Sequence, residues 1–490
     1  MRPFKIAKKT KIYISLALVL VCNPVIATTA DLSQITRLAN QGDIISQTNL
    51  AEMYYEGKVV PQDYKKALEW TQKAANQGNA RAQTALGYMY YEGKVVPQDY
   101  KKALEWYQKA ANQGYARAQM DLGFMYEKGR GVRQDHQKAF EWYQKAANQG
   151  YARAQTALGY IYYEGKVVPQ DYKKALEWYE KAANQGEVDS QVRLGFMYAE
   201  GKGVRQDYQK TIEWFMKAAN QGDAQSQFNL GLMYAEGKGV RQDYQKALEW
   251  YQKAANQGYM YAQFNLGLMY DEGEGVPQNY KKAVEWYEKA ANQGYVQSQV
   301  NLGVMYNDGK GIGQDYKKAL EWYQKAANQG DAIAQSNVGT MYYNGKGVPQ
   351  DYQKGLEWYE KAANQGAAIA QIKLGSIYEE GRGVRQDYHK AIEWYTKAAN
   401  QGDALAQISL GFMYGNGHGV RQNDKKSVEW FTKAANQEDA LAQSMLGMIY
   451  KNGEGVPQDY KKAKEWYGKA CDNGDQRGCD AYKDLKQKGF

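Results

Sequence analysis

The sequence has little of the side-chain chemistry on which enzymes and metal sites most often depend. Its 490 residues include three histidines, three cysteines and eight prolines. The histidines are His136, His389 and His418, and the first is far along the chain from the other two. A metal centre needs several such ligands close together, and nucleophilic catalysis needs a nucleophile beside a base. We therefore predict no catalytic residues, no metal site and no cofactor.

Long apolar segments are absent except near the N-terminus. Residues 1–11 carry five basic residues and no acidic one, and an apolar run over residues 12–22 leads into the sequence NPVIATTA. This is the pattern of a secretory signal peptide. Cleavage is predicted after Ala27, with Ala30 as the second choice. The run is shorter than the ~20 residues that a membrane span needs, so the mature chain is not expected to stay inserted in a membrane.

The signal peptide predicts an exported protein, either periplasmic or secreted. A cysteine, Cys22, ends the apolar run. Lipoprotein signals place a small residue directly before such a cysteine, whereas this chain has Val21. Lipid anchoring at Cys22 is therefore not favoured.

A strong excess of one charge is lacking too. The formal net charge is +9, and removal of residues 1–27, with five basic residues and no acidic one, leaves 9 − 5 = +4. Basic residues alternate with acidic ones, as in Glu69 and Lys73, which are spaced to pair on a helix. Because no basic stripe forms, we expect no nucleic-acid partner.

What the sequence has in abundance is repetition, and the tryptophans show it most clearly. Every step between successive tryptophans is 36 residues, a period typical of a solenoid of stacked units. The twelve are Trp70, Trp106, Trp142, Trp178, Trp214, Trp250, Trp286, Trp322, Trp358, Trp394, Trp430 and Trp466.

Each repeat is predicted to contain two helices. In the second repeat, residues 80–93 form the first helix, and Gly93 is placed where a helix ends in the left-handed conformation. Asp99 is the expected N-cap of the second helix, which runs to Gly114. Asn279 replaces this aspartate in one later repeat. Neither helix could bury its apolar side alone, so each must pack on its neighbours.

The repeats resemble the Sel1-like repeat family, relatives of the tetratricopeptide repeats. The resemblance rests on segments such as DALAQISLGFMY (403–414) and GVPQDYQKGLEWYEKAANQG (347–366). It implies an all-α fold, a right-handed α/α superhelical solenoid of about twelve 36-residue helix-turn-helix repeats with a concave ligand surface. The expected organisation is a signal peptide (1–27), an N-terminal capping helix (28–42), twelve repeats (43–474) and a C-terminal capping helix (475–490).

The resemblance also implies a function and one covalent link. Relatives act as scaffolds that assemble other proteins, and exported bacterial members act in the cell envelope or at a host interface. Cysteine-rich relatives carry pairs with the spacing of Cys471 and Cys479, which implies a disulfide here. Gln437-Glu438 departs from the family pattern, which has Gln-Gly.

Two alternatives follow from the same family. Some cysteine-rich relatives are linked to β-lactam binding or hydrolysis, but no serine here begins an S-x-x-K motif, and S-D-N and K-T-G are absent. The other alternative is a regulator that binds peptidoglycan or cell-wall enzymes. We favour a non-catalytic scaffold that works as a monomer.

Variation among the repeats predicts where a partner binds. In the first helix of each repeat, positions equivalent to Ile45, Thr48, Asn49, Glu52 and Tyr55 change freely, and we call these positions the variable face. These positions fall on one side of the helix. We predict that this side lines a concave groove that binds a protein or peptide. The alternative is that the side is merely exposed to solvent and that its residues vary without a functional reason. The predicted binding residues are Arg81, Tyr88, Tyr91, Arg117, Phe124, Arg153, Tyr160, Tyr163, Phe196, Phe228 and Phe264.

Overall fold

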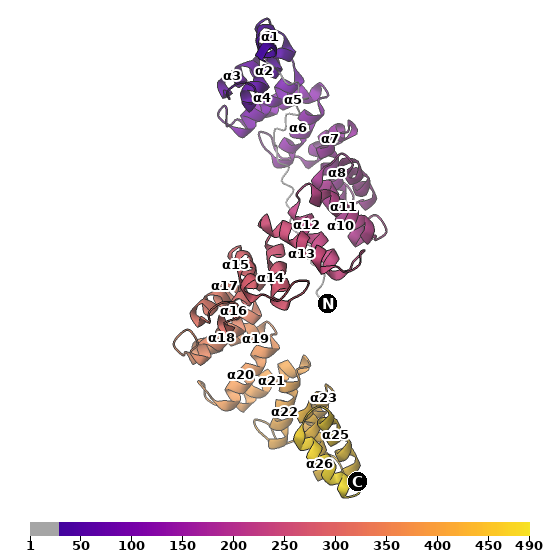
Figure 1. Ribbon diagram of the computed structural model, residues 1–490, viewed down its shortest axis with the longest axis vertical. Helices are drawn as coiled ribbons and strands as arrows, with labels where there is room; N and C mark the ends of the chain where they lie inside the picture. The colour runs from indigo at the N-terminus through magenta and orange to yellow at the C-terminus, as the bar shows by residue number, and fades with distance from the viewer. Residues whose placement is uncertain (1–28) are drawn as a thin grey trace. The chain divides into compact units, whose positions relative to one another are not determined.

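The computed structural model describes residues 29–490 as a series of 26 helices, with no strand in that range. The predicted signal peptide lies outside the described residues. Except in the sixth repeat, whose helices fall in two different compact units, each repeat contributes two antiparallel helices that pack side by side. Within each unit, successive pairs stack in chain order (Figure 1). The predicted all-α solenoid of twelve repeats is confirmed.

The first helix of each repeat is named the A helix and the second the B helix. The A helices are α2 (Ile44–Glu56), α4 (Ala80–Glu92), α6 (Ala116–Lys128), α8 (Ala152–Glu164), α10 (Val188–Glu200), α12 (Ala224–Glu236), α14 (Met260–Glu272), α16 (Val296–Asp308), α18 (Ala332–Asn344), α20 (Ala368–Glu380), α22 (Ala404–Asn416) and α24 (Ala440–Asn452). The B helices are α3 (Tyr64–Asn76), α5 (Tyr100–Asn112), α7 (His136–Asn148), α9 (Tyr172–Ala183), α11 (Tyr208–Asn220), α13 (Tyr244–Asn256), α15 (Tyr280–Asn292), α17 (Tyr316–Asn328), α19 (Tyr352–Asn364), α21 (Tyr388–Asn400), α23 (Asp424–Ala435) and α25 (Tyr460–Asp472). One further helix precedes them, α1 (Thr29–Asn40), and one follows, α26 (Gln476–Gln487).

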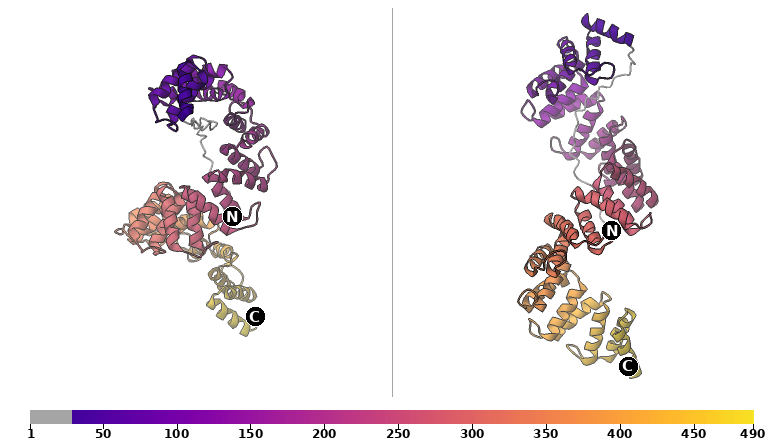
Figure 2. Two further views of the ribbon diagram at one scale, coloured as in Figure 1. Left: turned by 45° about the horizontal axis from the view of Figure 1, so that its top comes forward. Right: turned by 60° about the vertical axis from the view of Figure 1, so that its left-hand side comes forward.

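The chain divides into two compact units, one ending at Gln242 and the other running over Asp243–Phe490. The first unit therefore contains helices α1 to α12, and the second contains α13 to α26. Within each unit, the two further views show the same stacking of helix pairs (Figure 2).

The helix ends follow the local signals in the sequence. Asp99 accepts hydrogen bonds from the backbone N–H groups of Lys101 and Lys102 and so caps α5. Asn279 caps α15 in the same way. Gly93 ends α4 with φ of 74°, in the left-handed region that glycine enters without a Cβ clash. The predicted caps are therefore confirmed.

Each repeat packs around a leucine or valine of the A helix and alanines of the B helix. Leu122 is fully buried, and so are Ala110 and Ala146 of the helices on either side. The B helix adds a large ring, and Tyr107 and Tyr143 are almost completely buried. The rings lie against a glycine of the A helix, because a Cβ at Gly123 would stand 2.7 Å from the Tyr143 ring. The absent side chain lets the two helices approach closely.

A buried glutamine of each A helix joins neighbouring repeats. Gln83 of α4 donates from Nε2 to the carbonyl oxygen of Ala75, at the end of the previous B helix, at 3.1 Å. Its Oε1 accepts from Nε2 of Gln113, at the end of the B helix of its own repeat, at 2.8 Å. Gln299 repeats this arrangement with Ala291 and Gln329 in the second unit. The amide thus satisfies backbone and side-chain groups at each joint.

The lysine expected to pair with a glutamate on the B helix takes a different partner. Lys73 lies over the ring of Trp70, with Nζ 4.0 Å from the centroid. The same contact occurs at all twelve tryptophans, at 3.7–4.3 Å. No ion pair joins Glu69 to Lys73 in the described chain. The indole three residues earlier offers both apolar contact for the lysine stem and a cation–π interaction.

The two terminal helices cover the outer repeats. Leu32 and Ile35 of α1 pack against the buried cluster that includes Leu50 and Trp70. At the other end, Cys471 and Cys479 form a disulfide that links α25 to α26. Among the described helices, none is both long enough and apolar enough to cross a membrane.

Candidate functional site

The variable face lies along the A helices, and only part of it is accessible. The position of Thr48 is buried in most repeats, where Met120 and Ile408, for example, belong to the core. The leucine or valine at the position of Leu86 is at most 1% exposed in every repeat, which agrees with its nearly constant identity. At the position of Arg81, side chains are instead half-buried or exposed. Repeats 2 to 5 of the first unit carry most of the predicted binding residues.

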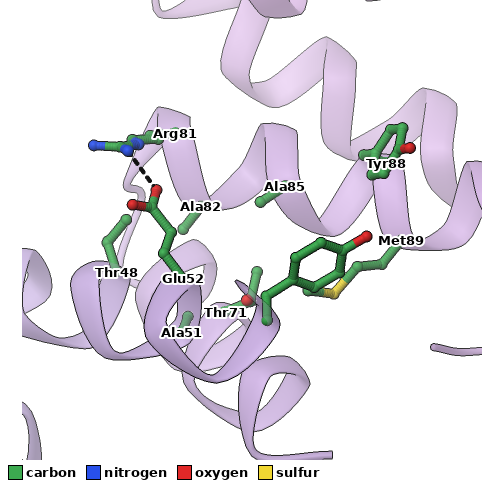
Figure 3. A pocket seen from close by; sticks show the side chains of 10 residues that line it. Thr48, Ala51, Glu52, Thr71, Arg81, Ala82, Ala85, Tyr88 and Met89 are labelled. Carbon is green, nitrogen blue, oxygen red and sulfur yellow. Dashed lines mark ion pairs between the residues drawn. The ribbon is translucent and has the colours of Figure 1, made fainter. Parts of the chain in front are cut away.

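Arg81 pairs with an acidic residue of the preceding repeat. Its guanidinium lies 2.5 Å from Oε1 of Glu52, which is almost completely buried (Figure 3). The pair stands at the edge of a small pocket between α2, α3 and α4, and Tyr88 and Thr71 are also among its lining residues. A threonine occupies position 71, where later repeats have a tyrosine or phenylalanine, and the missing ring leaves room for about one water molecule.

Arg117 pairs with Asp121 one turn later on α6. Nε of the arginine is 3.7 Å from Oδ2 of the carboxylate, which is buried. Burial raises the pKa of Asp121 to about 6, while the positive charges of Arg117 and Arg153 act to lower it. The two guanidinium groups therefore favour the charged form of the Asp121 carboxyl, which burial disfavours.

Arg153 pairs with the next repeat. Its Nε lies 3.7 Å from Oε1 of Glu187, the residue directly before α10, and both side chains are partly exposed. Burial raises the pKa of Glu187, and the guanidinium of Arg153 opposes this shift. All three predicted arginines therefore form ion pairs within the protein.

The aromatic residues of the first unit fall into two groups by exposure. Tyr88, Tyr91 and Phe124 are buried, with 7%, 5% and 7% of their surface exposed. Tyr91 and Phe124 lie with ring centroids 6.3 Å apart, and Arg130 lies over both rings. These three rings therefore pack beneath the variable face and contribute little to its accessible surface.

The second group remains partly accessible. It consists of Tyr160, Tyr163, Phe196 and Phe228, all half-buried. The ring of Phe196 packs edge-on against Phe215, with 5.1 Å between centroids. In repeats 4 to 6, these four rings carry accessible aromatic surface on the variable face.

Phe264 belongs to the second unit and is buried there. It is 6% exposed and packs against Tyr287 and Tyr295, with centroids 5.9 and 5.0 Å away. Its ring is therefore part of the core in that unit.

Sequence reasoning found the arginines and aromatic residues but missed their acidic partners. Asp121 lies four residues after Arg117, a helical pairing distance that the sequence shows directly. Glu52 and Glu187 belong to the repeat before or after their arginine, so only the stacking of A helices reveals those pairs. In residues 29–490, no group of three or more histidine, cysteine, aspartate or glutamate side chains could hold a metal ion.

The fold defines the class of protein to which this chain belongs, a helical-repeat scaffold with pairs of antiparallel helices. The family model named Sel1 repeat matches twelve segments, over residues 44–79, 80–115, 116–151, 152–187, 188–223, 224–259, 261–295, 296–331, 332–366, 368–403, 404–439 and 440–475. The chain belongs to the Sel1 repeat family, as the sequence resemblance predicts.

Among the solved structures similar to this chain, two share about a third of its sequence. One is a protective antigen of uropathogenic Escherichia coli strains that displays an SLR fold, 36% identical over 93% of this chain and 97% of that one, with a TM-score of 0.78. The other is a Sel1 repeat protein from Oxalobacter formigenes, 35% identical over 63% of this chain and 90% of that one, with a TM-score of 0.50. Comparison with curated proteins found no match.

Proposed function

We propose that this protein is an exported, non-catalytic scaffold that binds a protein or peptide through the variable face of its first unit. The accessible rings of Tyr160, Tyr163, Phe196 and Phe228 carry this proposal, together with the arginine–acid pairs beside them. Aromatic residues and arginine are the side chains most enriched at protein-binding hot spots. The scaffold acts as a monomer in the bacterial envelope or at a host interface.

Several observations support export. The N-terminal segment has the composition of a signal peptide. The disulfide between Cys471 and Cys479 suits an oxidising compartment. The similar Escherichia coli protein is described as a protective antigen, a property that suits a protein accessible to the immune system. N-terminal sequencing of protein from periplasmic and culture fractions tests this, and a mature chain beginning at Thr28 is expected.

The variable face offers both apolar and charged contacts to a partner. The half-buried rings supply apolar surface that is already held in place by packing, so little side-chain freedom is lost on binding. Ion pairs such as Arg153–Glu187 supply charges of both signs at partly exposed positions. Such a surface favours a partner that presents apolar side chains together with polar ones.

The test uses affinity capture from the native envelope with the purified mature chain as bait. The triple variant Arg153→Ala, Tyr160→Ala, Phe196→Ala is expected to lose the captured partner, because it removes the charge and two accessible rings. The control is the double variant Glu141→Ala, Gln144→Ala, which alters exposed positions of the B helix α7. Equal capture by the triple variant and the wild type would contradict the proposal.

The absence of catalysis has its own test. Purified protein is expected to leave the β-lactam nitrocefin intact, and hydrolysis would contradict the proposal. A pull-down with isolated peptidoglycan sacculi separates protein binding from cell-wall binding, since only the latter retains the scaffold on sacculi free of protein.

A further inference from the structure

A row of exposed aliphatic side chains runs along the A helices of the second unit. Ile333, Ile369, Leu405 and Leu441 occupy the second position of α18, α20, α22 and α24, and 62%, 66%, 62% and 37% of their surface is exposed. We call these four residues the aliphatic row. In repeats 2 to 8 the same position holds polar or aromatic side chains, namely Arg81, Arg117, Arg153, Asp189, Gln225, Tyr261 and Gln297.

The four residues of the row occupy equivalent positions in four successive repeats. Ala332 packs against the buried cluster that contains Ala370, and Ala368 packs against the one that contains Ala406. Ala332 and Ala368 each directly precede a residue of the aliphatic row. Four successive repeats therefore each present one exposed aliphatic side chain at the same helix position.

The apolar surface widens at the last two repeats. Phe412 and Met448 are 36% and 37% exposed. They lie seven residues after Leu405 and Leu441 and so on the same side of α22 and α24. Contiguous exposed apolar surface of this kind marks interaction sites on soluble proteins.

Acidic residues line one edge of the row. Asp331, Asp403 and Asp439 are the N-caps directly before α18, α22 and α24, two residues from the row. Glu438, three residues before Leu441, adds a further exposed acidic side chain. Within the second unit, no ion pair joins any of these four acids to a lysine or arginine.

Glu438 has its charge at a position where the backbone favours glycine. Its φ is 66°, and it is the one residue other than glycine with positive φ in the described chain. Gly402 and Gly474 occupy the equivalent position in the repeats on either side, with φ of 95° and 92°. A side chain retained in a strained backbone conformation points to a role outside the fold itself.

We infer that the aliphatic row binds an amphipathic, lysine- or arginine-rich helix of a partner protein. The acidic edge decides between the possible occupants. A second copy would bring acidic edges together, and an anionic membrane would repel them, whereas a basic helix neutralises them. This surface is separate from the binding residues proposed for the first unit.

The spacing of the row suits a helix laid across it. Neighbouring packed helices lie about 8–10 Å apart, and seven residues of an α-helix advance about 10.5 Å. One aliphatic residue per heptad therefore meets one residue of the row per repeat. A helix also satisfies its own backbone hydrogen bonds. An extended peptide would need donors and acceptors on the surface it binds, and the aliphatic side chains of the row offer none.

The test measures binding of synthetic helical peptides to the full mature chain by fluorescence anisotropy. The probe peptide has one leucine per heptad flanked by lysines, and two matched peptides replace either the lysines by glutamate or the leucines by serine. The wild type is expected to bind only the leucine–lysine peptide. The variant Ile369→Ser, Leu405→Ser, Leu441→Ser should bind it about tenfold more weakly.

Two single variants separate binding from folding. Ile45→Ser changes a residue at the same helix position in the first unit, 69% exposed, and should leave peptide binding unchanged. Glu438→Gly restores the residue that the backbone favours, so it should raise Tm while weakening peptide binding about threefold. If Glu438 had no part in binding, Glu438→Gly would change Tm and leave peptide binding unchanged.

Three results would overturn the inference. The first is equal binding of the glutamate peptide and the lysine peptide. The second is self-association of the wild type in sedimentation that the triple serine variant abolishes, which would assign the row to a second copy. The third is co-sedimentation with phosphatidylglycerol vesicles that depends on the row, which would assign it to a lipid surface.

Discussion

At the scale of single residues, the fit between glycine and an aromatic ring sets the distance between the two helices of a repeat. In the second unit, a Cβ at Gly303 would stand 2.5 Å from the ring of Tyr323. The first repeat has the larger Ala51 at the glycine position and the smaller Thr71 at the ring position. This exchange shows within one chain that the two positions are physically coupled.

Gly303→Ala is therefore expected to destabilise the second unit by about 1–3 kcal/mol, because the added methyl group forces Tyr323 or its helix to shift. Urea denaturation followed by circular dichroism measures the change. Gly313→Ala is the matched control in the same repeat, since its Cβ would meet nothing within 4 Å. Equal stability of the two variants would contradict the coupling.

Asp121 gives a pH-dependent prediction. Burial raises its pKa in the folded state to about 6, above the ordinary value of 3.8. The folded state thus binds the proton more tightly than the unfolded state does, so this residue lowers stability as pH rises from about 4 to about 6. Above pH 6 the penalty is complete.

Asp121→Asn should accordingly gain stability relative to the wild type as pH rises through that window, with a constant difference above it. Thermal melts of both proteins between pH 4 and pH 8 give this difference directly. Asp135→Asn is the control, because Asp135 is a cap of α7 and asparagine serves as a cap equally well. A pH-independent difference for Asp121→Asn would show that folding does not raise the pKa of Asp121.

At the scale of helices, the buried glutamines are the main connection that sequence reasoning did not reveal. Gln299 bonds to Ala291 across a joint and to Gln329 within its repeat. The same position is a glutamine in every repeat, which is typical of a packed residue, but the partners of a buried amide depend on how helices meet in three dimensions. The caps at Asp99 and Gly93 were predictable because the interacting groups are only a few residues apart.

Gln299→Leu should cost about 1–3 kcal/mol, because it leaves the Ala291 carbonyl and the Gln329 amide without their buried partner. Hydrogen exchange should show faster opening of α15 and α16 than in the wild type. Gln297→Leu, an exposed change on the same helix, should leave exchange unaltered. Similar exchange in both variants would contradict the role of the joint.

The candidate site was predictable only in part, for the same reason. Its variable positions and side-chain types followed from comparison of the repeats with one another. Local spacing could not show that Arg81 and Arg153 are held by acids of neighbouring repeats, or that Phe124 is covered by its neighbours. Likewise, Lys73 contacts Trp70 rather than Glu69, because the ring offers a cation–π interaction together with apolar contact for the lysine stem.

At the scale of the whole molecule, stability is expected to be a sum of repeats and joints, because each repeat contacts mainly its neighbours. Deletion of residues 332–367 removes one complete repeat and brings Gln371 to the carbonyl of Ala327, which recreates a standard joint. The shortened chain should keep its helical content per residue and melt cooperatively. Circular dichroism measures both.

Deletion of residues 332–349 is the matched control, since it removes one A helix with its loop and brings two B helices together. That chain should lose helical signal beyond the deleted residues, because no A helix covers the B helix on one side. Equal behaviour of the two deletions would contradict the additive description of the array.

The uniform joint formed by each buried glutamine also bears on how the gene can change over time. Recombination between two nearly identical stretches adds or removes whole 36-residue periods. Every product inherits ready-made contacts at the new boundary, so array length can drift without a search for compensating mutations. Lineages descended from one ancestor should then differ in length by multiples of that period, while surface side chains diversify independently.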